Sequence, residues 1–472
     1  MPRVSPLEVY RNLPGTNCGE CGEGTCMAFA SALIERRKSY EDCKPLVTEP
    51  KYAEKLEKLI ELVTPPVKEV VVGTGERACV LGGEEVMYRH ELTFFNPTAV
   101  FIDVSDDMGE EELVKRAKAV EEFGMERMGQ VLRLQGVAIR AKSGDDARFG
   151  EAVLAVAENT SLPYMLCSTQ PEMIEVGVEV APERRPLIYA ATSENVEEMG
   201  ELGARYSLPV VASDASPQRL LEIVSKLRSA GVEDIVLDPG TAPPGRGLGR
   251  CLERMAALRR LAIERGQRLA GYPIMGTPMV AWLDEEDEVR AAVKECIIAS
   301  AQLLRHADLL VLHSLEMFSL LPLLTLRQNI YTDPRVPIQV DAKLYEIGKP
   351  DEKSPVLLTT NFALTYYTVA SDIEAGKVNC YLLVVDTEGL AVEPAMAGAK
   401  LTGSVVKEAI DSSGVAKKVR HRKLIIPGMA ARISGEIEDV TGWKVIVGPV
   451  DSSRIPAFIQ EKWSPNGDGS GG

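Results

Sequence analysis

The chain has 472 residues, which is long for a single hydrophobic core, so we expect two or three domains. Its formal net charge of −16 argues against nucleic acid and anionic membrane surfaces as partners, because both are bound by basic patches. No apolar run approaches the roughly 18 residues of a membrane-spanning helix, and the first residues do not resemble a signal peptide. We therefore expect a cytoplasmic protein.

Four of the nine cysteines lie close together near the N-terminus with the spacing C-x2-C-x4-C-x16-C. They are Cys18, Cys21, Cys26 and Cys43. Four thiolates are the standard ligands of a [4Fe-4S] cluster, and the glycines between them let the backbone turn around it. A structural zinc site and unligated thiols are the alternatives, although zinc sites usually come as two C-x2-C pairs. The apolar spacing after Cys26 predicts a short helix that returns the chain to Cys43.

The other five cysteines are scattered, and we interpret them as buried core residues, since free cysteine behaves as a small hydrophobe. They are Cys79, Cys167, Cys251, Cys296 and Cys380. A charged segment from residue 44 to 68, with an amphipathic helix around 52–63, is expected to link the cysteine motif to the next domain.

Eight short apolar runs then alternate with helical patterns, which predicts a TIM (β/α)8 barrel. The predicted strands are Ala99–Val104, Gly136–Arg140, Pro163–Ser168, Pro186–Ala191, Pro209–Ser213, Asp234–Asp238, Gly271–Thr277 and Ala307–His313. The predicted helices include Glu110–Phe123, Glu194–Arg205, Pro217–Ala230, Ala256–Arg265 and Glu286–Leu304.

Chemistry in such a barrel takes place at the carboxyl ends of the strands, where this sequence offers a thin set of polar residues. They are Ser105, Asp106, Asp107, Arg140, Ser168, Asp214, Asp238, His313 and Ser314. Only four histidines occur in the whole sequence, and none is grouped with cysteines here. We therefore expect a docking surface here rather than a catalytic site.

The barrel pattern breaks at Ile330–Pro355, and a small open α/β domain is expected to follow. Its predicted strands are Cys380–Asp386, Lys423–Pro427 and Lys444–Pro449, and its predicted helices are Ala363–Glu374, Leu401–Asp411, Gly428–Val440 and Ser453–Lys462. All three strands end in turns that contain Gly or Pro. Such turns let a flat ligand approach backbone amides, but ordinary turn chemistry explains them equally well.

Taken together, these segments resemble the large (gamma) subunit of the corrinoid/iron–sulfur protein of the acetyl-CoA decarbonylase/synthase system. The residues that carry the resemblance are NCGECGEGTC with Cys43, TTNFALTYYTVASDIE (359–374), LLVVDTEGL (382–390), KLIIPGMAARISGEIED (423–439) and VGPVD (447–451). The resemblance covers essentially the whole chain, in the same domain order.

The resemblance implies an α/β protein with three domains and a tail. Residues 1–60 would form the [4Fe-4S] domain with its linker helix, 61–335 the TIM barrel, 336–463 a Rossmann-like or flavodoxin-like corrinoid-binding domain, and 464–472 a flexible tail. The corrinoid contacts that it implies are Thr359, Thr360, Asn361, Thr365, Tyr366, Thr387, Glu388, Gly389, Leu390, Gly428, Gly448 and Pro449.

By the same resemblance, the corrinoid cobalt accepts a methyl group from a methyl-tetrahydropterin and delivers it to the nickel–iron–sulfur cluster of acetyl-CoA synthase. The donor could be tetrahydrosarcinapterin, tetrahydromethanopterin or tetrahydrofolate. The implied partners are a small (delta) subunit that completes a heterodimer, acetyl-CoA synthase, a methyl-pterin methyltransferase and a low-potential electron donor such as ferredoxin.

The sequence lacks the Asp-x-His-x-x-Gly motif with which many corrinoid proteins ligate cobalt, and His421 lies in a basic run that we interpret as solvated surface. We therefore predict a cobamide without a protein lower ligand, which makes cobalt(II) easier to reduce, by analogy with axial ligation in haem. The cluster would then return the electron that cobalt(I) occasionally loses.

Two rival functions remain open from sequence. One is a ferredoxin-like electron-transfer or interaction subunit without corrinoid. The other is a self-sufficient pterin methyltransferase whose active site lies in the barrel.

Overall fold

The structure is a computed structural model that describes residues 4–464. It divides into two compact units. One consists of the residues up to 125 together with 132–333, and the other of 126–131 together with the residues from 334 onward. Within the described residues, no helix is both long enough and apolar enough to cross a membrane.

The first unit begins with a small helical part made of α1 (Pro6–Arg11), α2 (Cys26–Ile34), α3 (Lys44–Thr48) and α4 (Ala53–Val63). Two short 3-10 turns, Tyr40–Asp42 and Pro50–Tyr52, connect these helices. Thr25 caps α2 by accepting a hydrogen bond from Ala28 N, which satisfies one of the free amides of the first turn. Phe29, Leu33, Leu46 and Leu59 pack into a core of their own. Helix α2 is the helix expected after Cys26, and α4 is the expected linker helix.

The larger part of this unit is the predicted barrel, which is confirmed. Its eight parallel strands are β3 (Ala99–Ser105), β6 (Gly136–Arg140), β7 (Tyr164–Cys167), β8 (Leu187–Ala191), β9 (Val210–Ser213), β10 (Ile235–Asp238), β11 (Met275–Gly276) and β12 (Leu309–Leu312). Each strand neighbours the next along the chain, and β12 pairs with β3. A parallel bridge between Leu237 and Ile274 brings β11 beside β10, so the barrel is nearly closed.

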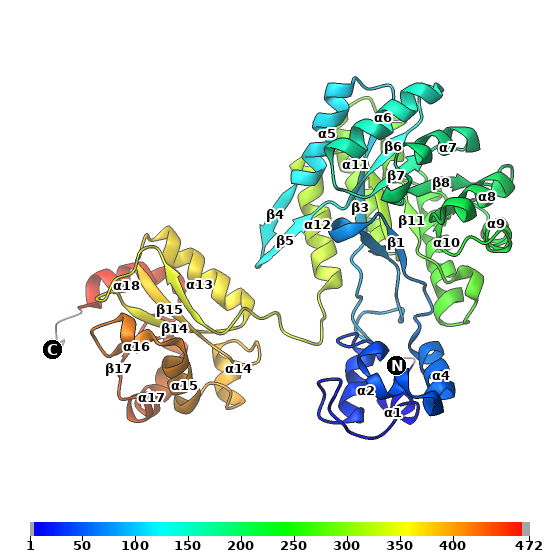
Figure 1. Cartoon of the computed structure of the whole chain (residues 1–472). Coiled ribbons are helices and arrows are strands. Elements are labelled where there is room, and N and C mark those ends of the chain that lie inside the picture. The colour runs from blue at the N-terminus through cyan, green and yellow to red at the C-terminus, as the bar shows by residue number, and fades with distance from the viewer. Residues whose placement is uncertain (1–3, 465–472) are drawn as a thin grey trace. The chain divides into compact units, whose positions relative to one another are not determined.

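Eight helices surround these strands (Figure 1). They are α5 (Glu110–Glu122), α6 (Asp146–Asn159), α7 (Pro171–Val180), α8 (Val196–Tyr206), α9 (Pro217–Ser229), α10 (Arg246–Ile263), α11 (Glu288–Leu303) and α12 (Met317–Tyr331). Successive strand residues alternate between the helices and the barrel interior. In β3, Val100 and Ile102 pack toward the helices, whereas Ala99 and Phe101 fill the interior.

Two antiparallel hairpins were not predicted from the sequence. The first, β1 (Val70–Val72) with β2 (Cys79–Leu81), places Val70, Val72 and Leu81 in the same apolar cluster as the barrel interior. Gly73 N donates to Arg185 O just before β8, so this hairpin lies at the amino ends of the strands and closes the barrel floor. The second hairpin joins β4 (Gly124–Arg127) to β5 (Gln130–Arg133).

Arg259 is the largest fully buried side chain of the described residues, and it lies in the barrel unit between two carboxylates. Its Nη1 lies 3.0 Å from Glu84 Oε2, and its Nη2 lies 2.6 Å from Asp308 Oδ2. Burial and the nearby Asp308 charge raise the pKa of Glu84 to about 8, against the opposing effect of Arg259. The Arg259 guanidinium therefore offsets much of the free-energy cost of burying the Glu84 and Asp308 carboxyl groups.

Replacing Arg259 with Met is expected to lower the free energy of unfolding of the barrel by about 3–5 kcal/mol, because two buried carboxyl groups lose their cation. Chemical denaturation followed by circular dichroism measures this change. The exposed neighbour Arg260 gives the matched control, since Arg260→Met should leave the barrel's stability within about 0.5 kcal/mol of the native value. Equal stabilities of the two variants would contradict the role given to Arg259.

The second unit contains a five-stranded sheet with the order β13-β15-β14-β16-β17. The strands are β13 (Leu344–Ile347), β14 (Val356–Thr360), β15 (Cys380–Val385), β16 (Lys423–Ile426) and β17 (Lys444–Val447). Strand β13 is antiparallel to β15, and the other pairs are parallel.

Helices cover both faces of this sheet. Helices α13 (Ala363–Ala375) and α18 (Ile455–Lys462) contact each other, and their side chains share an apolar cluster with Leu357 and Ile425. Helices α14 (Val392–Ala397), α15 (Gly403–Ser413), α16 (Val415–Lys418) and α17 (Ser434–Thr441) pack around Leu358 and Ile426, which point the opposite way. The sheet is therefore the middle of three layers.

The sequence interpretation missed strands β13 and β14, and it treated Ile330–Pro355 only as a break in the barrel pattern. Helix α12 extends to Tyr331, and β13 lies inside that range. β13 is a short edge strand, half exposed and partly charged, so it lacks the apolar run that marks a central strand. Of the tail expected over 464–472, residues 465–472 lie outside the described residues.

Candidate functional site

The C-terminal sheet has a topological switch point between β14 and β16. The chain leaves β14 through α13 toward β15, whereas it leaves β16 through α17 toward β17 on the other side. Such a divergence leaves a crevice at the carboxyl ends of the two strands, which is where open α/β sheets bind ligands. A cavity of about 410 Å³ lies there.

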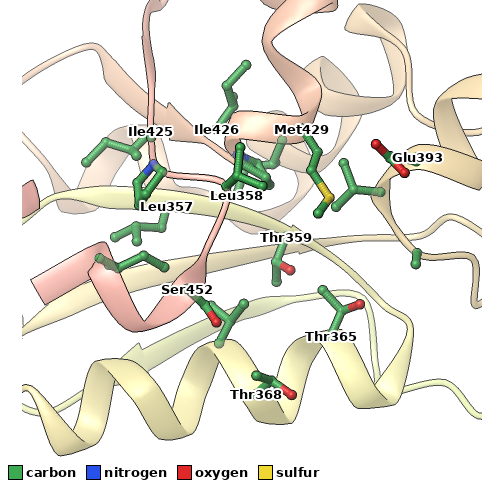
Figure 2. A pocket seen from close by; sticks show the side chains of 18 of the residues that line it. Leu357, Leu358, Thr359, Thr365, Thr368, Glu393, Ile425, Ile426, Met429 and Ser452 are labelled. Carbon is green, nitrogen blue, oxygen red and sulfur yellow. The ribbon is translucent and has the colours of Figure 1, made fainter.

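Apolar side chains form the floor and walls of this cavity (Figure 2). Leu357 and Leu358 come from β14, and Ile425 and Ile426 come from β16. Figure 2 shows Thr359 between Met429 on one side and Thr365 of α13 on the other. Glu393, at the start of α14, is the acidic residue of the lining.

Two buried hydroxyl groups of β14 are unpaired. Thr359 and Thr360 are each about 1% exposed, and neither Oγ1 atom has a hydrogen-bond partner among residues 4–464. Thr359 lines the cavity. A buried polar atom without a partner is costly, so the Thr359 hydroxyl is suited to hydrogen-bond a polar group of a ligand.

The four N-terminal cysteines line one small hollow together with Asn17, Thr25 and Phe29. Cys26 is the first residue of α2, and Cys43 directly precedes α3. Cys18 is exposed, whereas Cys26 and Cys43 are buried. Within the described ranges, no three His, Cys, Asp or Glu side chains are arranged to hold a single metal ion.

Backbone groups around this hollow point toward sulfur. Asn17 N donates to Cys26 Sγ at 3.4 Å, and Asn17 Oδ1 accepts from Cys26 N, which fixes the loop. Asn17, Gly15, Gly19 and Gly22 have positive φ, as a chain that wraps a central group requires. Burial raises the pKa of Cys43, a hydrogen bond from Leu46 N lowers it, and the three other thiols raise it. Four sulfur donors with amides directed at them fit an iron–sulfur cluster.

Known proteins match the chain along nearly its whole length. A family model described as "CO dehydrogenase/acetyl-CoA synthase delta subunit" matches residues 69–459, and one described as "Putative Fe-S cluster" matches residues 13–45. The acetyl-CoA decarbonylase/synthase complex subunit gamma 1 of Methanosarcina thermophila is 48% identical over 98% of this chain and 99% of its own. The gamma subunit of Archaeoglobus fulgidus is 46% identical over the same shares. The chain belongs to this family of gamma subunits.

Among solved structures, dihydropteroate synthase from Thermus thermophilus is similar to 56% of this chain and to all of its own, with a TM-score of 0.39 and 18% identity. At that score the similarity carries no argument about the site. The family match instead agrees with the resemblance drawn from the sequence motifs, and it adds that the gamma-type chain shares residues 69–459 with the delta-type family.

In this gamma-type chain, the residues predicted to contact the corrinoid divide into two groups. Thr359, Thr365, Gly448 and Pro449 line the cavity. Gly428 supports it from behind, since its N donates to Pro449 O and a Cβ there would come within 2.8 Å of Gly448 O. These five residues come from four separate segments that the fold brings together.

Of the other predicted contacts, all except Thr360 have structural partners of their own. Asn361 Oδ1 accepts hydrogen bonds from Thr387 N, Thr387 Oγ1 and Gly389 N, and Leu390 O accepts from Thr387 Oγ1. Glu388 pairs with Lys400. The Tyr366 ring packs against Tyr345 in a tilted arrangement, with ring centroids 4.6 Å apart. Thr360 is buried beside the cavity but does not line it.

The interpretation of His421 as solvated surface was wrong. The ring is only 8% exposed, lies edge-on to Trp463 and accepts a hydrogen bond from Lys423 N on Nδ1. Its Nε2 lies 2.9 Å from Ser354 O, and burial lowers the pKa of His421. The basic neighbours in sequence concealed this packing, since Arg420 and Arg422 are exposed although His421 between them is buried.

The barrel mouth holds a polar cluster that the sequence interpretation did not assemble. Asp103 is fully buried in β3, and its carboxylate lies 2.6 Å from His313 Nδ1 and 2.7 Å from Arg140. Burial would raise the pKa of Asp103, but the His313 hydrogen bond and the Arg140 and Arg116 charges lower it. Across the barrel, Tyr189 and Ser213 donate to Asp238. Strand alternation could have revealed this cluster. Apart from Arg116, each of these residues lies two positions after an apolar residue of the barrel interior, as Asp103 does after Phe101.

Most remaining polar residues of the mouth stabilise loops. Asp106 accepts hydrogen bonds from Lys142 N and Ser143 N, Asp107 pairs with Lys142, and Asp214 caps Ser216. Ser168 accepts from Gln170 N. Ser105 donates to Asp107, and Ser314 contacts Ser319. The set therefore divides into one buried cluster and several local caps.

Replacing Cys26 with Ala is expected to remove most of the bound iron, because one of the four sulfur donors is lost. Anaerobic purification followed by iron analysis and visible absorbance measures this change. Cys79→Ala, which alters a buried cysteine of β2, is the matched control and should retain native iron. Native iron content in Cys26→Ala would contradict the assignment, as would zinc in place of iron in the unmodified protein.

Proposed function

We propose that this gamma-type chain is a corrinoid and iron–sulfur methyl carrier of the acetyl-CoA decarbonylase/synthase system. A bound corrinoid would supply a cobalt that accepts a methyl group from a methyl-tetrahydropterin and passes it to the nickel–iron–sulfur cluster of acetyl-CoA synthase. The observation that carries this proposal is the apolar cavity at the switch point between β14 and β16.

The chemistry of this cavity suits a large flat ligand. Leu357, Leu358, Ile425 and Ile426 offer an apolar floor, and the Thr359 hydroxyl has no other partner among the described residues. At the rim, Gly448 and Pro449 add little bulk, so the ligand can approach the backbone closely. The residues present therefore fit a corrinoid, whose ring is apolar and whose edge carries amides.

His421 is the histidine of the C-terminal domain, and its ring is held by Ser354, Lys423 and Trp463. The cavity lining contains no histidine among its described residues. This supports the proposal of a cobamide without a protein lower ligand.

At the other end of the chain, the role of Cys18, Cys21, Cys26 and Cys43 would be to hold a [4Fe-4S] cluster for electron supply to the carrier. The amides of Asn17 and Leu46 would hydrogen-bond the sulfurs and help to set the potential. Two of the cysteines are buried and one is exposed, so the cluster would lie close to solvent and within reach of a donor such as ferredoxin.

The proposed partners follow from the family names. The relatives are gamma subunits of a multi-subunit complex, which supports pairing with a small (delta) subunit and transfer to acetyl-CoA synthase. The barrel would then serve as a docking surface for these partners. We propose neither nucleic acid nor membrane as a partner.

Metal analysis of the anaerobically purified protein tests the proposal directly. We expect about four iron atoms and about one cobalt atom per chain, with visible bands that shift on reduction and methylation. Iron without cobalt would favour the electron-transfer subunit instead. Methyl transfer from methyl-pterin by the isolated chain, without a second enzyme, would favour catalysis in the barrel.

Replacing Thr365 with Trp is expected to lower cobalt content at least about tenfold, because the larger ring would fill the cavity. Iron content should not change, since the cysteines lie in the other unit. Val440→Trp, at an exposed position of α17 outside the cavity lining, is the matched control. Full cobalt retention in Thr365→Trp would place the corrinoid elsewhere.

A further inference from the structure

Glu393 is the one charged residue in the described lining of the cavity between β14 and β16. The other lining residues are apolar or carry only a hydroxyl group. Figure 2 shows the Glu393 carboxylate on the side of the cavity where Met429 lies. A ligand that fills this cavity therefore has a single carboxylate beside it, in surroundings that are otherwise uncharged.

This carboxylate is not paired within the protein. Among residues 4–464, it takes part in no hydrogen bond and no ion pair. Lys400 is the nearest basic residue along the chain, and it pairs with Glu388 instead. The negative charge of Glu393 is thus not neutralised by a neighbouring cation.

Helix capping does not account for Glu393 either. An acidic residue in the first turn of a helix commonly accepts hydrogen bonds from the free amides there. Helix α14 has no side-chain cap of this kind, and Pro394, the next residue, has no N–H to donate. Val392 and Ala395 of the same helix are buried, whereas Glu393 is exposed. Its position serves the cavity rather than the helix.

We propose that the Glu393 carboxylate lowers the cobalt(II)/cobalt(I) reduction potential of a corrinoid bound in this cavity. This role rests on the proposed function, because it assumes that a corrinoid fills the cavity. Reduction adds one electron and so removes one unit of positive charge from the bound ring. A nearby negative charge favours the more positive state, and apolar surroundings screen this interaction less than water does.

Glu393 would act against the effect of the missing lower ligand. Without an axial donor, cobalt(II) is easier to reduce, and the resulting cobalt(I) is a weaker electron donor. By making the reduction harder again, the carboxylate would return part of the nucleophilic strength that attack on a methyl group requires. The protein would then set the potential with a charge at the cavity edge instead of a ligand on the metal.

The test is a spectroelectrochemical titration of the cobalt bands in the full-length holoprotein, with soluble mediators as the electron source. In Glu393→Gln, the ratio of cobalt(I) to cobalt(II) at a fixed potential should rise at least about threefold, as expected for a unit charge about 10 Å away in a partly hydrated site. At about 59 mV per tenfold change for one electron, this is a shift of about 28 mV to higher potential. Glu393→Lys changes the charge by two units and should raise the ratio about ninefold.

Glu408→Gln is the matched control, because it removes the same charge from the same domain. Glu408 is exposed on α15 and does not line the cavity. Its replacement should change the ratio less than about 1.5-fold, since salt screens exposed charges beyond about 10 Å. Glu393→Asp keeps the charge and should restore a ratio close to the native one, which a purely steric role would not predict.

The outcomes separate this role from the carrier function. A native potential in Glu393→Gln, with native cobalt content, overturns the role of Glu393 and leaves the carrier function intact. Loss of more than about half of the cobalt from Glu393→Gln also overturns it, because the residue would then serve to bind the ring. An equal shift in Glu408→Gln has the same consequence. Absence of cobalt from the unmodified protein overturns both this role and the proposed corrinoid site.

Discussion

The candidate site of the C-terminal domain depends on one constraint, which is that parallel strands are joined by right-handed crossovers. The chain must move to one side of the sheet after β14 and to the other after β16, and the connecting helices therefore cover opposite faces. The gap between the carboxyl ends of these two strands stays uncovered. Apolar residues that belong to the two faces of the sheet, such as Leu357 and Leu358, meet there in one cavity.

The barrel shows the opposite result of the same strand-helix unit. Each barrel strand pairs with its neighbour in sequence, so the order never reverses and no crevice of this kind forms. Its inward residues instead meet around a common axis, where the Asp103 carboxylate pairs with Arg140 and His313. The same unit therefore gives paired polar groups at the barrel mouth and an apolar cavity at the switch point of the C-terminal sheet.

The sequence was most informative where a pattern repeats. Eight apolar runs at regular spacing predicted the barrel and its strand positions to within a few residues, because strands buried on both faces need continuous apolar sequence. β13 lacks such a run, and β1 and β2 are only three residues long, whereas β14 was missed although it is buried along its whole length. The spacing of the four N-terminal cysteines predicted that they share one site, and in the structure they line one hollow.

The candidate corrinoid contacts show what sequence does not contain. Thr359 lies near the end of the apolar strand β14, and Thr387 follows the apolar strand β15. Thr359 has an unpaired hydroxyl at the cavity, whereas Thr387 bonds to Asn361. Which hydroxyl stays free depends on a partner 26 residues away in the chain. His421 illustrates the same limit, because its basic neighbours suggested exposure and its burial depends on Trp463. The local sequence pattern identified the segments that surround the cavity. Contacts with distant residues determine which side chains in these segments are available to a ligand.

The β1–β2 hairpin has a consequence for how this chain can be divided. Val70, Val72 and Leu81 belong to the interior of the barrel, although they lie directly after the cysteine domain in sequence. A domain boundary at the first barrel strand, near Ala99, would remove the β1–β2 hairpin from the barrel. Phe101 and Leu309 of the barrel interior would then be exposed to water. An exchange of the cysteine domain, by evolution or by engineering, must therefore divide the chain near Pro65 and Pro66. The β1–β2 hairpin then remains with the barrel whose interior it covers.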